Sequence, residues 1–257
     1  MTLVQGRTAV SAKADGAVRA TTRERPSGGP FRKTARVIGA MYVAGFVVGI
    51  VGEGLIQSVI GTPNHLATVS ASALTLAIGV VLWLIAVAGD AAHGVLMFPV
   101  LKPVGERLAV GYLAARILDA AFIAIMALFL ALQIPLGSEY LKAAAADLPT
   151  LQALSTVLVQ ASQYAYQFGM ITLGVSGLTL SYALYKAKLL PRALSIWGLV
   201  GYTVIFAGMI SQVMGSGLGL ASSIPGGLWE AFVGFWLIFK GFSAPSSAST
   251  AKVAASR

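Results

Sequence analysis

The chain has 257 residues; 57% are hydrophobic, 11% are charged, and the net charge is +9. Soluble domains carry about 25% charged residues, so this composition excludes a water-soluble single domain and indicates a polytopic membrane protein. The chain contains no cysteine, which excludes disulfides, thiolate metal sites and iron–sulfur clusters, and its basic residues lie almost entirely outside the apolar runs, which favours membrane topology over nucleic-acid binding as their explanation.

Polar segments flank the apolar part of the chain. Residues 1–30 are rich in Arg, Ser, Thr, Gly and Ala, and no apolar stretch follows Met1, so we expect a disordered basic cytoplasmic tail rather than a secretory signal. Residues 243–257 are of low complexity and predict a disordered C-terminal tail. Residues 31–242 between them are predicted to form one transmembrane domain.

Six apolar segments follow one another in this domain, each close to or above the ~20 residues that cross a bilayer. They run over about 37–60, 72–101, 108–132, 154–185, 193–214 and 225–242. Strict period-2 alternation is absent, which disfavours a membrane barrel and predicts an all-α bundle of six transmembrane helices. In the largest loop, a short interfacial helix is expected to start at Ser138.

Charge alternates from loop to loop. The N-terminal tail, the second and fourth loops and the C-terminal end are basic, whereas the first and fifth loops carry no charge. Because cytoplasmic loops are enriched in Lys and Arg, this pattern predicts an even number of crossings with both termini cytoplasmic, and we expect the plasma membrane of a bacterium. Six segments also divide into two halves of three with opposite orientation, as in an inverted-repeat transporter, although the two halves of this chain share no residue-level similarity.

Ionisable side chains in two neighbouring spans form the first candidate site. Asp90 and His93 share one helix face in the second segment, and Arg116 and Asp119 share one in the third. The short loop between these segments places all four at similar depth, so we expect Asp90 to pair with Arg116, and His93 or Arg116 with Asp119. One interpretation is a structural ion-pair network that fixes helix register. The other is a proton relay or anion-binding site in which His93 titrates.

A second polar set is predicted towards the outer side of the membrane. Its members are Glu53, Gln57, Gln160, Gln163, Gln167, Gln212 and Glu230. Three of these glutamines form one helical stripe with Tyr164, and such a stripe must face the bundle interior or water. Either this set lines an outward-open polar cavity between the first, fourth, fifth and sixth segments, or it makes interhelical hydrogen bonds worth about 0.6 kcal/mol each.

Several residues and motifs have a simpler interpretation. His65 is expected in a loop, and glycines at positions 45, 49, 52, 169, 174 and 177 predict close helix packing. No Ser-x-x-Lys, Gly-x-Ser-x-Gly, His-Glu-x-x-His or P-loop pattern occurs, so we expect no catalytic residue, metal or cofactor.

Three stretches carry a family resemblance: RKTARVIGAMYVAGFVVGIVGE, VLKPVGERLAVGYLAARILDAAFI and LSYALYKAKLLPRALSIWGLVGY. Their motifs are Leu-Lys-Pro after the second segment, Arg-x-x-acid in the third and Leu-Pro-Arg before the fifth. From about Phe31 to Phe242, the chain resembles the domain-of-unknown-function 4386 family of bacterial membrane proteins. The resemblance implies a six-helix inner-membrane protein without assigning it an activity. Relatives often carry Glu at the position of Asp119, and a His in the polar stripe where this chain has glutamines.

These observations favour a non-enzymatic membrane protein that binds or moves a small ligand through a polar interior. The expected inner gate or relay consists of Asp90, His93, Arg116 and Asp119. The expected outer vestibule is lined by Glu53, Gln163, Gln167 and Glu230. The alternatives are an interaction or stress-response protein whose buried polar groups hold the bundle together and, third, a membrane-embedded enzyme, for which only His93 offers a general base near neutral pH. The expected partners are the lipid bilayer and a small molecule.

Overall fold

The computed structural model of the protein describes residues 31–215 and 217–243. The two predicted tails therefore lie outside the described residues, except for Ser243. The described part is all-helical and contains no β-strand, as the sequence predicts.

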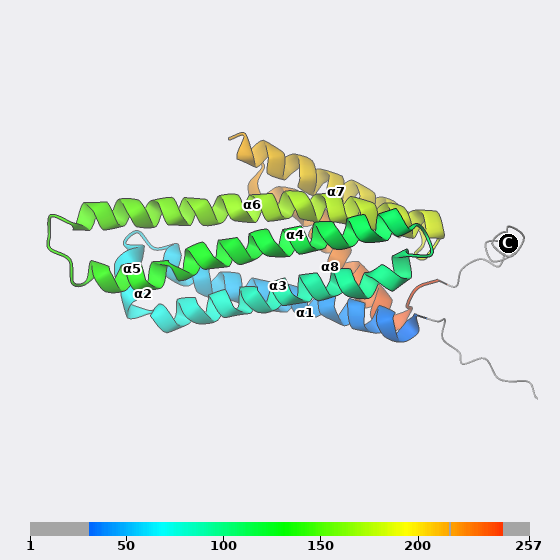
Figure 1. Cartoon of the computed structure of the whole chain (residues 1–257), viewed down its shortest axis with the longest axis horizontal. Helices are drawn as coiled ribbons and strands as arrows, with labels where there is room; N and C mark the ends of the chain where they lie inside the picture. Colours follow the sequence, from blue (N-terminus) through cyan, green and yellow to red (C-terminus); the bar gives the residue numbers. More distant parts are fainter. Residues whose placement is uncertain (1–30, 216, 244–257) are drawn as a thin grey trace, which may run out of the picture.

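Six main helices run back and forth along the long axis of the molecule (Figure 1). They are α1 (Arg32–Ile60), α3 (Ala73–Leu101), α4 (Glu106–Ala131), α6 (Leu148–Ala187), α7 (Arg192–Val213) and α8 (Ile224–Phe239). Two short helices, α2 (His65–Ala71) and α5 (Gln133–Tyr140), lie at one end, and the 3-10 helix η1 (Gly219–Ser223) joins α7 to α8. The main helices coincide with the six predicted apolar segments, because apolar runs broken by Gly, Pro and polar residues leave few other places for a helix to end.

Five helical segments of the described chain are long and apolar enough to cross a membrane. They are Arg32–Ile60, Ala73–Leu101, Glu106–Tyr140, Leu148–Ala187 and Arg192–Val213. The sixth predicted crossing corresponds to α8, which has 16 residues and rises by only about 24 Å, less than the ~30 Å hydrocarbon layer. Helix length and composition therefore support a multi-pass membrane protein but do not confirm the predicted count of six crossings.

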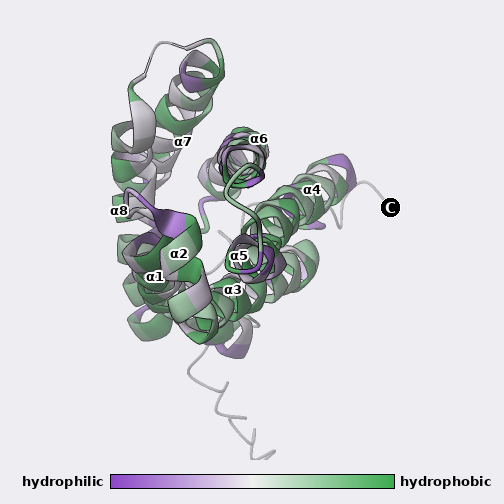
Figure 2. Ribbon diagram, turned by 90° about the vertical axis from the view of Figure 1, so that its left-hand side faces the viewer, coloured by the Kyte–Doolittle hydropathy of each residue, from purple (hydrophilic) through white to green (hydrophobic). Residues whose placement is uncertain are grey.

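The main helices form a closed ring in the packing order α1, α3, α4, α6, α7, α8 and back to α1. Figure 2 shows the helices along the long axis of the molecule, from the end that carries α2 and α5. Helices α1 and α6 do not pack along each other, because α7 and α8 lie between them. Polar side chains that point inward from different helices therefore share one interior.

The α7–α8 hairpin is shorter than the helices beside it. A Cβ atom on Gly174 of α6 would lie 2.8 Å from the Cβ of Phe206, and this antiparallel register brings the end of α7 level with Gln167. On the other side, Gly227 faces Phe46, so α8 begins level with about residue 50 of α1. The part of α6 that precedes Gln167 consequently extends beyond the hairpin (Figure 1).

Glycines allow close approach of the backbones at some crossings but not at all those predicted. Gly52 of α1 faces Gly79 of α3, and a Cβ on Gly39 would lie 2.5 Å from the carbonyl oxygen of Gly234 in α8. By contrast, a Cβ on Gly45 or Gly49 would meet nothing within 4 Å, so the predicted packing role of this pair is wrong. Spacing alone does not show which of several glycines on one helix reaches a neighbour.

Two predictions about the loops are also wrong. The short helix expected from Ser138 begins at Gln133, and His65, expected in a loop, is the first residue of α2. His65 Nε2 lies 2.5 Å from Ser155 Oγ on α6, and Ser155 Oγ lies 2.6 Å from Gln133 Oε1. The side chains of Leu66 and Val69 are also buried, and this packing stabilises a helix too short to form alone. The cap formed by α2, α5 and the start of α6 is therefore one packed unit.

Acid is expected to loosen this cap. Burial lowers the pKa of His65 below its ordinary value of 6.5. Above that value the imidazole is neutral whether or not α2 is docked, so pH has no effect there. As the pH falls below it, the undocked imidazole gains a proton that the docked one resists, and docking weakens until the lower docked pKa is passed. After correction for the intrinsic pH dependence of amide exchange, hydrogen exchange of the α2 amides should be faster at about pH 5 than at about pH 7.

The matched variant His65→Gln lacks the titrating group and is expected to show no such difference between the two pH values. Equal protection of α2 at both pH values in the unsubstituted protein would contradict this assignment.

Candidate functional site

An ion-pair chain joins α3 to α4 inside the ring. The guanidinium of Arg116, which is 5% exposed, bonds Asp90 of α3 and also pairs with Asp119 on its own helix, with 3.4 Å between Nη1 and Oδ2. Both pairings are among those that the sequence predicts. Gly94 makes room for them, because a Cβ at this position would lie 3.1 Å from the Cβ of Arg116.

His93 lies beside the Asp90–Arg116–Asp119 ion pairs but forms no ion pair with them. Its Nδ1 lies 2.6 Å from the hydroxyl of Tyr112, and its ring meets that of Tyr42 edge-on, with 4.5 Å between centroids. His93 is 2% exposed, and its Nε2 has no hydrogen-bond partner within the described part of the chain. The alternative pairing of His93 with Asp119 is not formed. Neither tyrosine is singled out by the sequence, because a tyrosine inside an apolar segment resembles any other core aromatic residue.

The structure places Glu230 with the inner residues rather than in the outer vestibule. Its Oε1 accepts a hydrogen bond of 2.6 Å from the hydroxyl of Tyr202, and its charge interacts with those of Arg116 and Asp90. The prediction from the sequence is wrong because it measures the depth of Glu230 from the start of the last segment and assumes that this start lies at the outer membrane surface. Since α8 begins level with about residue 50 of α1, its first turns already lie inside the bundle. We call the set Asp90, His93, Tyr112, Arg116, Asp119, Tyr202 and Glu230 the inner cluster.

A second group, the outer layer, lies towards the end that carries α2 and α5. Glu53 of α1 accepts hydrogen bonds from Gln57 Nε2 at 2.8 Å and from Trp83 Nε1 at 3.3 Å. The Trp83 ring meets Tyr166 of α6 edge-on, with 6.3 Å between centroids. Since Glu53 is eleven residues beyond Tyr42 on the same helix, the outer layer is about 16 Å from the inner cluster.

The glutamine stripe continues a packing face of α6 past the end of its partner helix. Gln160, Gln163 and Gln167 fall on the same heptad pattern as Gly174 and Gly177, which contact α7. Gln160 and Gln163 are exposed because α7 does not reach them, whereas Gln167 is half-buried. The Oε1 of Gln167 has no hydrogen-bond partner among the described residues. The stripe therefore extends past the end of α7, where Gln160 and Gln163 are exposed.

Two other glutamines of the predicted outer set have local roles. Gln57 supports Glu53, as described above. Gln212 Oε1 accepts a 2.9 Å hydrogen bond from the backbone N–H of Gly219 and so stabilises the turn between α7 and α8.

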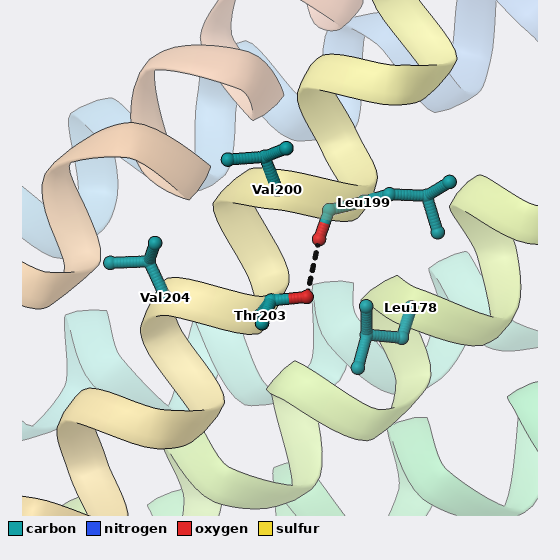
Figure 3. A pocket seen from close by; sticks show the side chains of 5 residues that line it. All are labelled: Leu178, Leu199, Val200, Thr203 and Val204. Carbon is teal, nitrogen blue, oxygen red and sulfur yellow. Dashed lines mark hydrogen bonds between the residues drawn. The ribbon is translucent and has the colours of Figure 1, made fainter.

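Two surface hollows lie away from both polar groups. One is an apolar groove of about 260 Å³ on the outside of α6 and α7, lined by Leu178, Leu199, Val200, Thr203 and Val204 (Figure 3). The Thr203 hydroxyl donates to the carbonyl of Leu199 at 2.8 Å, so the groove presents no free polar group. The other lies at the loop between α5 and α6, between Glu139 and Thr150. Neither contains a residue of the inner cluster or the outer layer, and among residues 31–215 and 217–243 no three His, Asp or Glu side chains gather as a metal site.

Comparison with known families covers nearly all of the helical region. Residues 37–241 match the model of a family described as domain of unknown function, DUF4386. The chain belongs to the DUF4386 family. This result confirms the resemblance seen in the sequence motifs, and the match to DUF4386 runs from α1 to just past the end of α8. Neither the curated proteins nor the solved structures yield a match.

Proposed function

We propose that this DUF4386 protein crosses a membrane six times, with both termini in the cytoplasm, and binds or moves a small ligand through the polar interior of its helix ring. In this proposal it is not an enzyme, and its partners are the lipid bilayer and the ligand. The family resemblance favours the plasma membrane of a bacterium.

The distribution of charge supports this topology. The start of α1 and the end of α8 lie at the same end of the bundle, together with the α3–α4 and α6–α7 loops (Figure 1). The basic residues at this end are Arg32, Lys33, Arg36, Lys102, Arg107, Lys186, Lys188, Arg192 and Lys240. The opposite end carries Lys142 against Glu139 and Asp147. By the positive-inside rule the first end is cytoplasmic, which requires α8 to act as the sixth crossing.

Unpartnered polar atoms inside the ring carry the ligand-binding proposal. His93 Nε2, Arg116 Nε and Gln167 Oε1 are buried and have no hydrogen-bond partner in the described structure. A network that only holds helices together satisfies its buried polar atoms, since each unsatisfied one costs about 1–3 kcal/mol. Atoms left unpaired at three places in one interior favour a ligand or water there.

The proposed route to these atoms begins beyond the end of α7. Gln163 is exposed there, and Glu53 and Tyr166 are half-buried. In this proposal a ligand that enters there meets the outer layer first and the inner cluster next. In this proposal Trp83 and Tyr166, which meet edge-on across the ring, separate the two.

One observation favours the alternative, a structural role. Arg116 is paired on both sides, and paired buried charges fix helix register without any ligand. The two functions differ in one measurable respect: a ligand route admits water, whereas a structural network is dry.

Thiol labelling tests the proposal, because the chain has no cysteine and any introduced thiol reports alone. Met170 lies on the stripe between Gln167 and Gly174, whereas Val175 on the same helix is 44% exposed on the outside of the ring. In proteoliposomes, a membrane-impermeant thiol reagent is expected to label Met170→Cys much faster than the control Val175→Cys, whose thiol faces lipid. If both variants stay unlabelled until the protein is denatured, the interior is dry and the ligand-binding function is wrong.

A further inference from the structure

We infer that the inner cluster binds a positively charged ligand, and that Glu230 is the residue that receives it. The inference rests on the proposed function and names the ligand class of the same site. Its basis is the charge, the hydrogen bonding and the accessibility of the cluster.

The charges of the inner cluster do not balance. It contains three carboxyl groups, on Asp90, Asp119 and Glu230, but one guanidinium, on Arg116. Arg116 is already held by the two aspartates. Glu230 is bonded to a neutral tyrosine, and no Lys, Arg or His of the described chain forms an ion pair with it. A carboxylate inside a membrane protein is costly without a counter-charge, so Glu230 takes up either a proton or another cation.

An unpartnered ring nitrogen lies near these carboxylates. His93 is 2% exposed, lies next to the ion-pair chain and interacts electrostatically with Arg116, and its Nε2 has no partner among the described residues. Imidazole nitrogen and carboxylate oxygen are both donors to cations. The charge count therefore disfavours the anion-binding alternative drawn from the sequence.

The remaining groups that face Glu230 carry no further positive charge. From α1, α4 and α7 these are the hydroxyls of Tyr42, Tyr112 and Tyr202, and from α6 it is Tyr166. These hydroxyls are neutral, so they do not compensate the charge of Glu230.

Tyr166 connects the carboxylates of the two polar groups. Tyr166 interacts electrostatically with Glu53 of the outer layer and with Asp119 and Glu230 of the inner cluster, so it lies between the two groups. The Asp90 side chain is 34% exposed although its partner Arg116 is 6% exposed. In this inference, a cation that passes Glu53 and the Trp83–Tyr166 pair meets further negative groups.

The test uses the full-length Met170→Cys protein in proteoliposomes and two probes of similar size. One is a methanethiosulfonate that carries a trimethylammonium group, and the other carries a sulfonate. The ratio of their rates, divided by the same ratio for a small thiol in solution, cancels differences in thiolate fraction and in the intrinsic reactivity of the probes. All ratios below are normalised in this way. We expect the cationic probe to react roughly tenfold faster than the anionic one, a preference that a nearby unpaired carboxylate produces at an effective dielectric constant of ~20.

Glu230→Gln keeps the acceptor for Tyr202 but removes the charge, and it is expected to bring the ratio severalfold closer to one. Glu106→Gln is the matched control. Glu106 is exposed at the first position of α4 and pairs with Lys102, so its replacement should leave the ratio unchanged. Glu230→Asp keeps a carboxylate at this position and is expected to keep most of the preference, so a ratio lost in Glu230→Gln but retained in Glu230→Asp assigns the effect to the charge and not to a disturbed fold.

The source of the positive charge is resolved by two further conditions. A preference that appears only when the pH is raised identifies the bound charge as a proton. A preference present at neutral pH that falls when Na⁺ or tetramethylammonium replaces a bulky cation at constant ionic strength identifies a cation of that kind. A ratio near one at every pH, or one that Glu230→Gln leaves unchanged, overturns the inference while leaving the water-accessible interior in place. Absence of labelling by both probes would instead refute the proposed function.

Discussion

Replacing Arg116 with leucine is expected to lower the free energy of unfolding by about 3–5 kcal/mol, because the change leaves a buried carboxylate without its counter-charge. Asp119 is 2% exposed and its ion-pair partner is Arg116. Asp90 loses the same partner, and its side chain is 34% exposed. The measurement is reversible unfolding in mixed detergent micelles, followed by circular dichroism.

Two comparison variants separate charge from packing. Arg107→Leu removes an exposed arginine from the same helix and should have little effect. Adding Asp119→Asn to Arg116→Leu removes the uncompensated charge and should recover a large part of the lost stability. If the double variant is no more stable than Arg116→Leu, the lost alkyl packing of Arg116, and not its charge, accounts for the effect.

The second large effect is a difference in sign between two identical substitutions on α1. Gly39→Ala is expected to destabilise the protein by about 1–3 kcal/mol, because the new methyl group would meet backbone atoms of α8 as well as the Ile238 side chain, and the backbone cannot give way without moving the helix. Its Cβ would lie 2.5 Å from the Gly234 carbonyl oxygen and 2.9 Å from the Ile238 nitrogen. Helix α8 must shift to accommodate it, and Glu230 shifts with it.

Gly49→Ala on the same helix is the matched control. Its Cβ would meet nothing within 4 Å, so only the better helix propensity of alanine remains, and a neutral effect or a gain of up to ~1 kcal/mol is expected. Thermal unfolding of both variants in the same micelles gives the comparison. Equal losses at both positions would show that the α1–α8 crossing is not the cause.

Residue periodicity and the length of the apolar segments are sufficient to predict the main helices and the ion pairs of the inner cluster. The Asp90–Arg116 pairing could be predicted because a short loop fixes the two spans as antiparallel neighbours and helix rise then sets the depth. Glu230 could not be placed in this way. Its depth depends on where α8 begins relative to α1, which is set by the close approach of Gly39 to Gly234 and not by any local signal.

Residues that act through long-range contacts were missed for the same reason. Tyr112 and Tyr202 belong to the inner cluster because of their partners on other helices. Both lie in the stretches that carry the family resemblance, but outside the three short motifs within them. Trp83 becomes part of the outer layer only through Glu53. Their one available signal was a polar atom on an aromatic residue inside an apolar run, since such an atom needs a partner when buried. The helix α2 was missed because its polar residues resemble a loop until Leu66 and Val69 are seen to be buried.

The shortness of α8 has a consequence for the surrounding lipids. Its 16 residues match only a thin hydrocarbon slab, whereas α1 on one side of it has 29 residues and suits a thick one. In the proposed six-crossing topology, acyl chains must therefore compress beside α8, and the Lys240 side chain would extend towards the headgroups. The lipid annulus would then be uneven around the ring, and short-chain phospholipids should gather preferentially at the α7–α8 side.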